Sequence, residues 1–412
     1  MRRTRALVGL SLIAGLTACG SARNAVSSAP AAPPAGATSC QPTVDAELTS
    51  IATRIEQQAV SGRNVVGTRN RLRASSALAA AVARGDAHAA RVALKPLVLH
   101  QVVRIELFEG TRRLVTVGTA PAFSPVRVAL RSGGRTVGSA RFSVMGDRSF
   151  MGITHRLTGA QLLLHAGRRR VMGTLAPGAT VPAHGTVTDH GVRYTTTTLP
   201  TRAFPAGALQ ISLLLPPAAP ALCGSDAADT RLQTVGAVGR RLLQAEQGSA
   251  GGGSSMRYVE RDAAFRRAAA AGDAAAVRAV VVGRFFAAHR YHIVRVRLTS
   301  GSHLVADVGG PYALAPATGT VRAPDGSVAG HVTISVQDDT GYIKLMHRFT
   351  GAAVQLRTAS GVLVPGSTLD PGPASIPAHG AVSYAGRSYR TLSYDAPAFP
   401  SGPLHVSLLL PQ

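Results

Sequence analysis

The chain has 412 residues and carries 44 Lys and Arg against 20 Asp and Glu, which gives a formal net charge of +24. Such an excess of positive charge favours acidic partners, with anionic lipid and the cell wall among them. Aromatic residues make up 4% of the chain, Trp is absent and the Arg residues are dispersed. The interleaved basic and aromatic residues of a nucleic-acid interface are therefore missing, and no nucleic-acid partner is expected.

The N-terminal segment has the pattern of an export signal. Three Arg residues precede the apolar stretch from Ala6 to Leu16, which is too short to span a bilayer. The stretch runs into Leu-Thr-Ala-Cys, which resembles the bacterial lipobox and implies cleavage before Cys19 and lipid attachment to its thiol. We therefore expect residues 1–18 to be a lipoprotein signal peptide, and lipid at Cys19 to hold the protein on the outer face of the cytoplasmic membrane. An ordinary secretory signal with an incidental Cys is the alternative.

The segment behind Cys19 predicts a tether and then a disulfide. Residues 19–39 consist almost wholly of Ala, Pro, Gly and Ser, and cannot bury enough apolar surface to become ordered, so we expect a flexible tether. Beyond it only Cys40 and Cys223 remain, in a compartment where disulfides persist. We expect these two residues to be bonded. Two free thiols are the alternative, because sequence alone does not show that they lie close together.

Self-similarity divides the rest of the chain into two copies of one domain. Three motifs recur 195 residues apart: Pro182-Ala183-His184-Gly185 as Pro377-Ala378-His379-Gly380, Phe204-Pro205-Ala206-Gly207 as Phe399-Pro400-Ser401-Gly402, and Leu213-Leu214-Leu215-Pro216 as Leu408-Leu409-Leu410-Pro411. Upstream, the spacing falls to 192 for the motif that starts at His155 and to 187 for Gly85-Asp86. Collinear matches with small drifts in offset indicate duplication followed by loop insertions and deletions. The expected copies are residues 40–217 and 223–412.

Each copy begins with helical sequence. Apolar residues stand at helical spacing between Asp45 and Gln58, and again between Leu232 and Leu242. Gly85-Asp86 and its equivalent Gly272-Asp273 predict a helix stop followed by a new N-cap. Further helices are expected at residues 74–83 and 263–271, after breaks at 61–68 and 251–255.

The pattern then changes to alternation. In residues 292–298, the apolar Val294, Val296 and Leu298 share one face of a predicted strand, while Arg295 and Arg297 lie on the other. In the second copy, further strands are expected at residues 304–308, 319–322, 330–336, 361–364, 379–384, 387–393 and 403–410, with a helix over 342–350. Helices first and antiparallel strands after them indicate an α+β fold.

Two segments of the second copy carry a family pattern. They are Asp307-Val308-Gly309-Gly310-Pro311-Tyr312-Ala313-Leu314-Ala315-Pro316 and Gly330-His331-Val332-Thr333-Ile334-Ser335-Val336-Gln337-Asp338-Asp339-Thr340-Gly341-Tyr342. With the strand before them and the helix after them, they resemble a Cache domain, the extracellular PAS-like sensor module. The resemblance covers residues 263–364, and more weakly 74–171. It implies a long N-terminal helix packed on an antiparallel sheet, extra C-terminal strands beyond the resemblance, and a pocket for an amino acid, a carboxylate or another small metabolite.

The first copy departs from this pattern. In place of the segment from Gln337 to Tyr342 it has Met145-Gly146-Asp147-Arg148-Ser149-Phe150, and Pro121 stands where the second copy has Tyr312. One carboxylate and both phenolic hydroxyls are lost, so the capacity for hydrogen bonding is lower. We expect the second copy to be the one that binds a ligand.

The residues that could bind a ligand in the second copy are Tyr312, Asp338, Asp339, Tyr342, Lys344 and Arg295. An acid could hold a ligand amine, the tyrosines could form walls that carry hydroxyls, and the basic residues could bind a carboxylate. The structural alternative is that Asp339 caps the following helix while Tyr342 packs in the core. Repeated histidines lack the spacing of metal ligands, so no metal site is expected. These histidines are His155, His184, His347 and His379.

Three kinds of function remain in view. The first is a surface-anchored lipoprotein that binds a small anionic or zwitterionic metabolite, such as an amino acid or an organic acid. The second is a structural or interaction lipoprotein that contacts the cell wall or a protein partner in the membrane. An enzyme is not expected, because the chain has no Gly-x-Ser-x-Gly elbow, no phosphate loop and no carboxylate pair at helical spacing. No catalytic residue and no cofactor is therefore assigned.

Overall fold

The computed structural model describes residues 40–97, 102–118, 122–167, 169–174, 181–204, 207–248, 252–288, 291–369 and 372–412. The expected signal peptide, the lipidation site Cys19 and the tether lie outside these residues. Residues 40–412 form one compact unit. Within its described part, no helix is long and apolar enough to cross a membrane.

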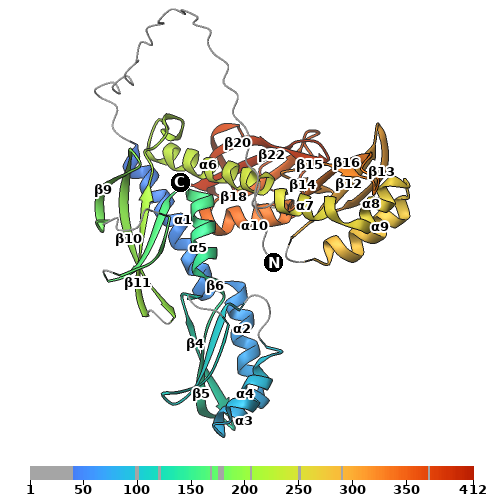
Figure 1. The fold of residues 1–412 in the computed structure, drawn as a ribbon. Helices are drawn as coiled ribbons and strands as arrows, with labels where there is room; N and C mark the ends of the chain where they lie inside the picture. Colours follow the sequence, from blue (N-terminus) through green and yellow to red (C-terminus); the bar gives the residue numbers. More distant parts are fainter. Residues whose placement is uncertain are drawn as a thin grey trace, which may run out of the picture. The chain divides into compact units, whose positions relative to one another are not determined.

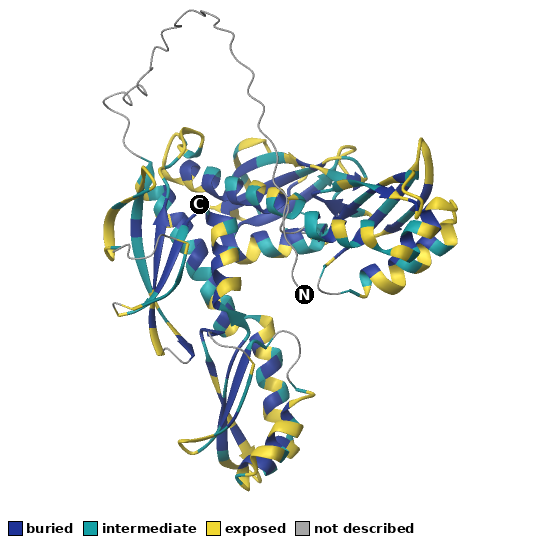
Figure 2. Cartoon of the chain, in the orientation of Figure 1, coloured by how far each residue is buried: buried dark blue, intermediate teal, exposed yellow. Residues whose placement is uncertain are grey.

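A helix of 21 residues opens each copy, α1 (Gln41–Ser61) in the first and α6 (Ala227–Gln247) in the second (Figure 1). The apolar spacing that predicts them also directs their packing, because these positions form the buried stripe of each helix (Figure 2). In α1 the stripe includes Leu48, Ile51 and Ile55; in α6 it includes Val235, Val238 and Leu242. Both predicted helices are confirmed.

Shorter helices follow in each copy. They are α2 (Arg63–Ala74), α3 (Ser76–Ala83) and α4 (Ala87–Leu94), and then α7 (Gly252–Arg261), α8 (Ala263–Ala270) and α9 (Ala274–Val280), which continues as a π-helix over Val281–Phe286. The predicted caps are confirmed, since Asp86 and Asp273 each accept a hydrogen bond at 2.9 Å from the backbone three residues on. The predicted breaks at 61–68 and 251–255 are too long. Helix resumes at Arg63 and at Gly252, because packing of Val65 and of Met256 and Val259 in the core outweighs weak local helix propensity.

A four-stranded antiparallel sheet stands behind these helices in each copy. The first has the order β2-β1-β5-β4, and the second has the equivalent order β13-β12-β16-β15. Its strands are β1 (Arg104–Glu109), β2 (Arg112–Gly118), β4 (Val126–Ser132) and β5 (Arg135–Ser143), and then β12 (Arg295–Ser300), β13 (His303–Gly309), β15 (Ala317–Arg322) and β16 (Val328–Ser335). Apolar side chains on one face of the sheet pack on the short helices. The other face is polar.

A second antiparallel layer carries the long helix of each copy. In the first copy it consists of β3 (Ala122–Phe123), β6 (Met145–Gly146), β7 (Gln161–Ala166), β8 (Arg169–Gly173), β9 (His184–Asp189), β10 (Val192–Phe204) and β11 (Gly207–Leu215). In the second it consists of β14 (Tyr312–Leu314), β17 (Gln337–Asp338), β18 (Ala353–Thr358), β19 (His379–Tyr384), β20 (Arg387–Ala396), β21 (Ala398–Pro400) and β22 (Leu404–Pro411). The α+β class is confirmed, and the extra C-terminal strands complete the layer on which α1 and α6 pack.

One predicted strand is wrong. Residues 361–364 form a single bridge between Leu363 and Arg357, while the strand in this region is β18, over Ala353–Thr358. The first four residues of β18 are all buried, and its sequence alternates between apolar and polar residues over Val354-Gln355-Leu356-Arg357. Such alternation is typical of a strand, so the signal for β18 was present and the predicted strand was placed too late in the chain.

The two copies meet through equivalent elements. Helix α1 packs against α6. Helix α1 also packs on α10 (Asp339–Thr350) of the second copy, and α6 packs on α5 (Asp147–Thr158) of the first copy. In each copy this shorter helix follows the four-stranded sheet. The guanidinium group of Arg241 donates to the carbonyl of Thr158 at 3.0 Å, at the C-terminus of α5. Arg54, its equivalent in α1, lies beside Gly351 at the C-terminus of α10. This reciprocity is that of a two-fold symmetric interface, and it joins both copies in one hydrophobic core.

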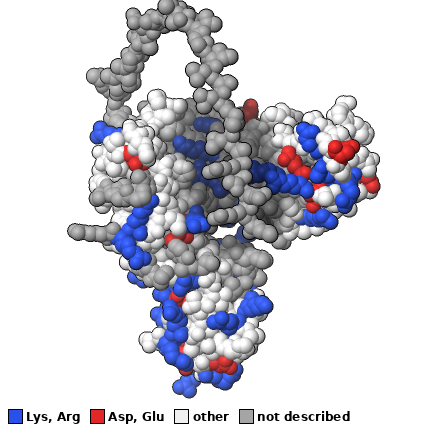
Figure 3. All heavy atoms as spheres, in the orientation of Figure 1, with Lys and Arg blue, Asp and Glu red and all other residues white. Residues whose placement is uncertain are grey.

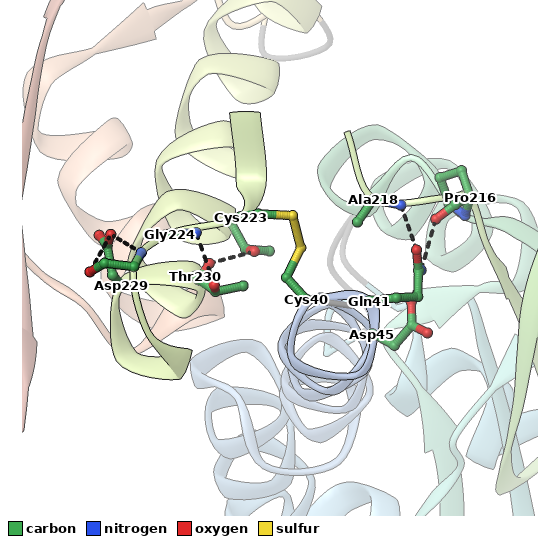
Figure 4. The surroundings of a disulfide bond; sticks show 11 residues. Cys40, Gln41, Asp45, Pro216, Ala218, Cys223, Gly224, Asp229 and Thr230 are labelled. Carbon is green, nitrogen blue, oxygen red and sulfur yellow. Dashed lines mark hydrogen bonds between the residues drawn. A yellow bond between two sulfur atoms is a disulfide. The ribbon is translucent and has the colours of Figure 1, made fainter. Parts of the chain in front are cut away.

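A disulfide closes this interface at one end (Figure 4). Cys40 and Cys223 stand just ahead of α1 and α6, and their Cα atoms lie 5.5 Å apart. The Gln41 side chain holds the segment that connects the two copies. It accepts a hydrogen bond from the backbone N–H of Ala218 at 2.6 Å and donates one to the carbonyl of Pro216 at 3.2 Å. The predicted Cys40–Cys223 bond is confirmed.

Candidate functional site

The six residues predicted to bind a ligand do not share one cavity. Tyr342 is fully buried in the core, and its hydroxyl lies 2.5 Å from that of Tyr394. Burial raises the pKa of Tyr342 well above its ordinary value and that of Tyr394 to about 12. Both phenols are therefore neutral core groups that satisfy each other. The structural alternative for Tyr342 is the one observed.

Arg295 is committed to structure as well. It is 7% exposed, and its guanidinium lies 2.7 Å from the Asp307 carboxylate. It also donates to the carbonyls of Gly309 and Gly310 and lies over the ring of Phe399. A ligand carboxylate would have to displace these partners, so Arg295 is not placed to bind one.

The remaining candidates occupy three different places. Asp338 is the N-cap of α10 and accepts from the backbone of Gly341 at 2.6 Å, so the cap expected at Asp339 is one residue earlier. Asp339 begins the helix, where burial and the neighbouring Asp338 raise its pKa. Tyr312 pairs with Pro400 in the second layer, and Lys344 points to solvent from α10. Asp338 also lines a cleft.

That cleft, the inter-copy cleft, has a volume of about 710 Å³. The second copy provides most of its lining, including Glu246 at the end of α6, His292, Gln337 and Asp338. The first copy provides Arg156 from α5. The lining also includes Ser254, Ser255, Phe286, Tyr291, Ile293, Val294, Val336, Gly341 and Leu345. The cleft is therefore formed mainly by the second copy, with Arg156 of the first copy on its border.

Charged groups of both signs face this cleft. Arg156 and Glu246 form an ion pair across the copies at 3.1 Å, with 38% and 15% of their side chains exposed. Burial raises the pKa of Glu246, while the nearby Arg156 and His292 oppose that rise. Asp338 uses Oδ1 to cap α10. A ligand that carries both an ammonium and a carboxylate group would find a partner for each.

Arg156 and Glu246 are not among the residues that the sequence predicts to bind a ligand. Arg156 lies in the repeated motif that starts at His155, but nothing in that motif marks it as a ligand-binding residue, and Glu246 belongs to no repeated motif. Each reaches the cleft through a helix whose position depends on the packing of α5 against α6. The only available signal was their place on predicted helices, which is common to many charged residues. A site between two copies is not visible in the sequence of either copy.

The repeated histidines have structural contacts. His155 and His347 lie in the last turns of α5 and α10. Their Nδ1 atoms hydrogen-bond to the carbonyls of Ala160 and Ala352, just beyond these helices, at 2.8 and 3.0 Å. His379 bonds to Asp229 at 2.6 Å, which ties β19 to α6. Within the described residues, no group of three or more His, Cys, Asp or Glu is placed to hold a metal ion.

No protein-family model and no curated protein matches the chain. Three solved structures to which it is similar are receptor domains. The ligand-binding domain of the Pseudomonas aeruginosa amino-acid chemoreceptor PctC, in complex with GABA, is 13% identical over 42% of this chain and 97% of that one, with a TM-score of 0.25. That of the Pseudomonas fluorescens chemoreceptor CtaA, in complex with L-alanine, is 10% identical over 43% and 95%, with a TM-score of 0.25. An extracellular ligand-binding receptor from Desulfohalobium retbaense is 9% identical over 55% and 47%, with a TM-score of 0.27.

The first two of these neighbours are ligand-binding domains of chemoreceptors. The TM-scores of all three are below 0.5, and nothing about the site of this chain follows from them.

Proposed function

We propose that this protein is a lipid-anchored, extracytoplasmic binding protein that takes a small zwitterionic metabolite, such as an amino acid, in the inter-copy cleft. The observation that carries the proposal is the convergence of Asp338, Glu246 and Arg156 on one open cleft of about 710 Å³. Small-ligand sites are concave and contain a few convergent polar groups, as this cleft does. In this proposal, residues 40–217 and 223–412 are the two copies and neither is an enzyme.

The roles of the three side chains follow from their contacts. The ligand ammonium lies at Oδ2 of Asp338, because Oδ1 is already used by the helix cap. The ligand carboxylate lies at Arg156, a guanidinium suited to bidentate binding. Glu246 holds Arg156 in place through the 3.1 Å ion pair. Because Arg156 and Asp338 come from different copies, the ligand would bridge them.

Isothermal titration calorimetry of the full chain in detergent, against the common amino acids and small organic acids, tests the proposal. The matched variant is Asp338→Asn, since Asn caps helices as well as Asp and removes only the charge. We expect it to weaken binding by about tenfold or more, the loss of one charged hydrogen bond. Lys344→Ala, on the solvent side of α10, is the control and should bind normally. Absence of any binding, or equal binding by Asp338→Asn, contradicts the proposal.

The anchor is tested separately, since Cys19 lies outside the described residues. Cells that express the chain with labelled palmitate should incorporate label into it, and Cys19→Ala should abolish both the label and membrane association. Two acyl chains give stable anchoring, so the wild-type chain should stay with the membrane at high salt, where charge attraction is screened. Unlabelled wild-type protein would favour an ordinary secretory signal.

An interaction lipoprotein is the second candidate, and one observation favours it. Tyr342 and Arg295 are both occupied by internal partners, so a large part of the expected ligand chemistry is used for structure. In that case the chain would contact a protein or cell-wall partner without a small ligand. Cross-linking that captures one defined partner, with unchanged capture by Asp338→Asn, would favour this candidate.

A further inference from the structure

The polar face of the first copy's four-stranded sheet carries a second hollow, far from Asp338 in sequence. It has a volume of about 570 Å³ and is lined by Phe108, Arg127, Arg141, Arg202 and Ala203, with the start of β11. We call it the arginine hollow. None of its lining residues is acidic. In Figure 3, Lys and Arg side chains run along the side of this module where β4 and β5 lie.

A buried carboxylate holds this surface in place. Glu106 is fully buried, and its two oxygens accept from Arg104 at 2.8 Å and from Arg141 at 2.6 Å. Arg113 lies 3.8 Å from the same carboxylate. Burial opposes ionisation, yet the bonds from Arg104 and Arg141 lower the pKa of Glu106. Glu106 is thus an anion around which guanidinium groups are fixed.

Aromatic rings orient the same guanidinium groups. Arg141 lies 4.8 Å from the centroid of Phe204 and 5.5 Å from that of Phe108, and Arg104 lies 5.3 Å from that of Phe204. Stacking and ion pairing together reduce the entropy that Arg141 would lose on binding a ligand. Its planar fork is therefore already positioned where it lines the hollow.

The positive charge here exceeds what Glu106 balances. Three guanidinium groups contact Glu106, those of Arg104, Arg113 and Arg141. Arg127 and Arg202 join Arg141 in lining the hollow, and no acidic residue is among the lining residues. Arg127 donates only to the hydroxyl of Ser139 among the described residues. Like charges at this density repel one another, and a bound oxyanion would relieve the repulsion.

The second copy shows that the fold does not require these arginines. Register places Thr318 at the position of Arg127 and Thr333 at that of Arg141, and the chain offset places Pro397 at that of Arg202. The same sheet forms with these residues, so strand pairing does not require Arg127, Arg141 or Arg202.

We propose that the arginine hollow binds a small organic anion with two or more oxyanion groups, such as a tricarboxylate or a diphosphate. Guanidinium forks match carboxylate and phosphate geometry in pairs, and the hollow has the volume of a small-molecule site. The site is independent of the inter-copy cleft. The site belongs to the first copy, for which the sequence predicted a lower capacity for hydrogen bonding to a ligand.

Calorimetry of the full chain with citrate and with pyrophosphate at low salt tests the site. The variants are Arg127→Thr, which installs the residue of the second copy, and Arg202→Ala; both side chains are exposed and neither contacts Glu106, so folding should be intact. We expect one of the two anions to bind and each variant to weaken it by about tenfold or more. Arg135→Thr, an equal loss of charge at the exposed turn between β4 and β5, is the control and should bind within twofold of wild type.

Three outcomes overturn the proposal. The first is no binding of either anion by the wild-type chain up to millimolar concentration. The second is an equal loss in Arg135→Thr, which would mean diffuse attraction rather than a site. The third is binding to phosphatidylglycerol vesicles that depends on Arg127 while both free anions fail to bind, which would assign the arginines to a lipid surface. Any amino acid found to bind the inter-copy cleft should bind Arg127→Thr as it binds the wild-type chain, which keeps this test separate from that of the inter-copy cleft.

Discussion

The hydroxyl groups of Tyr342 and Tyr394 meet beneath α6, where Gly239 leaves room for both. Tyr342→Phe would leave the Tyr394 hydroxyl without a partner in the core. We expect the free energy of unfolding to fall by about 1 to 3 kcal/mol. The double variant Tyr342→Phe/Tyr394→Phe should recover most of that loss, because no polar atom is then stranded. Urea denaturation of the three proteins measures both effects, and a double variant that is weaker than the single one would contradict the account.

Asp147, in the first turn of α5, predicts an unusual dependence on pH. It is 1% exposed, neither carboxylate oxygen has a hydrogen-bond partner among the described residues, and burial raises its pKa to about 6. The folded state therefore holds this proton more tightly than the unfolded state, whose value is 3.8. Stability is retained below about pH 4, falls as pH rises to about 6, and stays low above that.

Asp147→Asn should remove this penalty. We expect the variant to be more stable than wild type by on the order of 3 kcal/mol at pH 7.5 and equal to it at pH 4. Asp86→Asn, at an exposed helix cap, is the matched control and should show no such difference. Chemical denaturation at the two pH values decides the matter. Equal stabilities at pH 7.5 would mean that a water or another group solvates Asp147.

At this scale the sequence predicted the chemistry of single residues better than their grouping. Asp338 was correctly placed at the end of a strand and beside a helix start, because local patterns set both. Tyr342 and Arg295 were expected at a ligand, yet both are held by residues far away in the chain, Tyr394 and Phe399 among them. Such partners follow from tertiary packing, which no local spacing encodes.

Among the elements, α1 and α6 were predictable because each packs only one face, which leaves a period of 3.6 in the sequence. Asp86 and Asp273 were predictable because a cap is a contact within three residues. Strand β18 was missed, although the alternation in Val354-Gln355-Leu356-Arg357 is typical of a strand.

The disulfide between the starts of α1 and α6 joins residues 183 apart in sequence. Closing so long a loop restricts the unfolded chain, so reduction should lower the free energy of unfolding by about 2 to 5 kcal/mol. Thermal unfolding with and without dithiothreitol measures the change. Cys40→Ser/Cys223→Ser should melt like the reduced protein and should not respond to the reductant. A response in this double variant would show that the reductant acts elsewhere.

Across the whole molecule, the interface between copies has the reciprocity of a dimer. A chain of residues 40–222 would leave the apolar stripe of α1 uncovered, including Ile51 and Ile55. We expect this fragment to self-associate through α1, because the same helix can occupy the place of α6. Light scattering after size exclusion should give a dimer mass, and Ile51→Glu should shift it toward monomer. A folded, monomeric wild-type fragment would contradict the equivalence of the two helices.

Fusion of the two copies changes how substitutions act on this dimer-like arrangement. In a homodimer every substitution occurs twice, so a residue that suits one subunit must suit the other. Here each position is independent, and the central residue on the polar face of the sheet is Glu106 in one copy and Arg297 in the other. The joined helices supply the stability of a pair while each sheet face is free to acquire its own chemistry. A single polypeptide can in this way carry two surfaces of different charge on one folded unit.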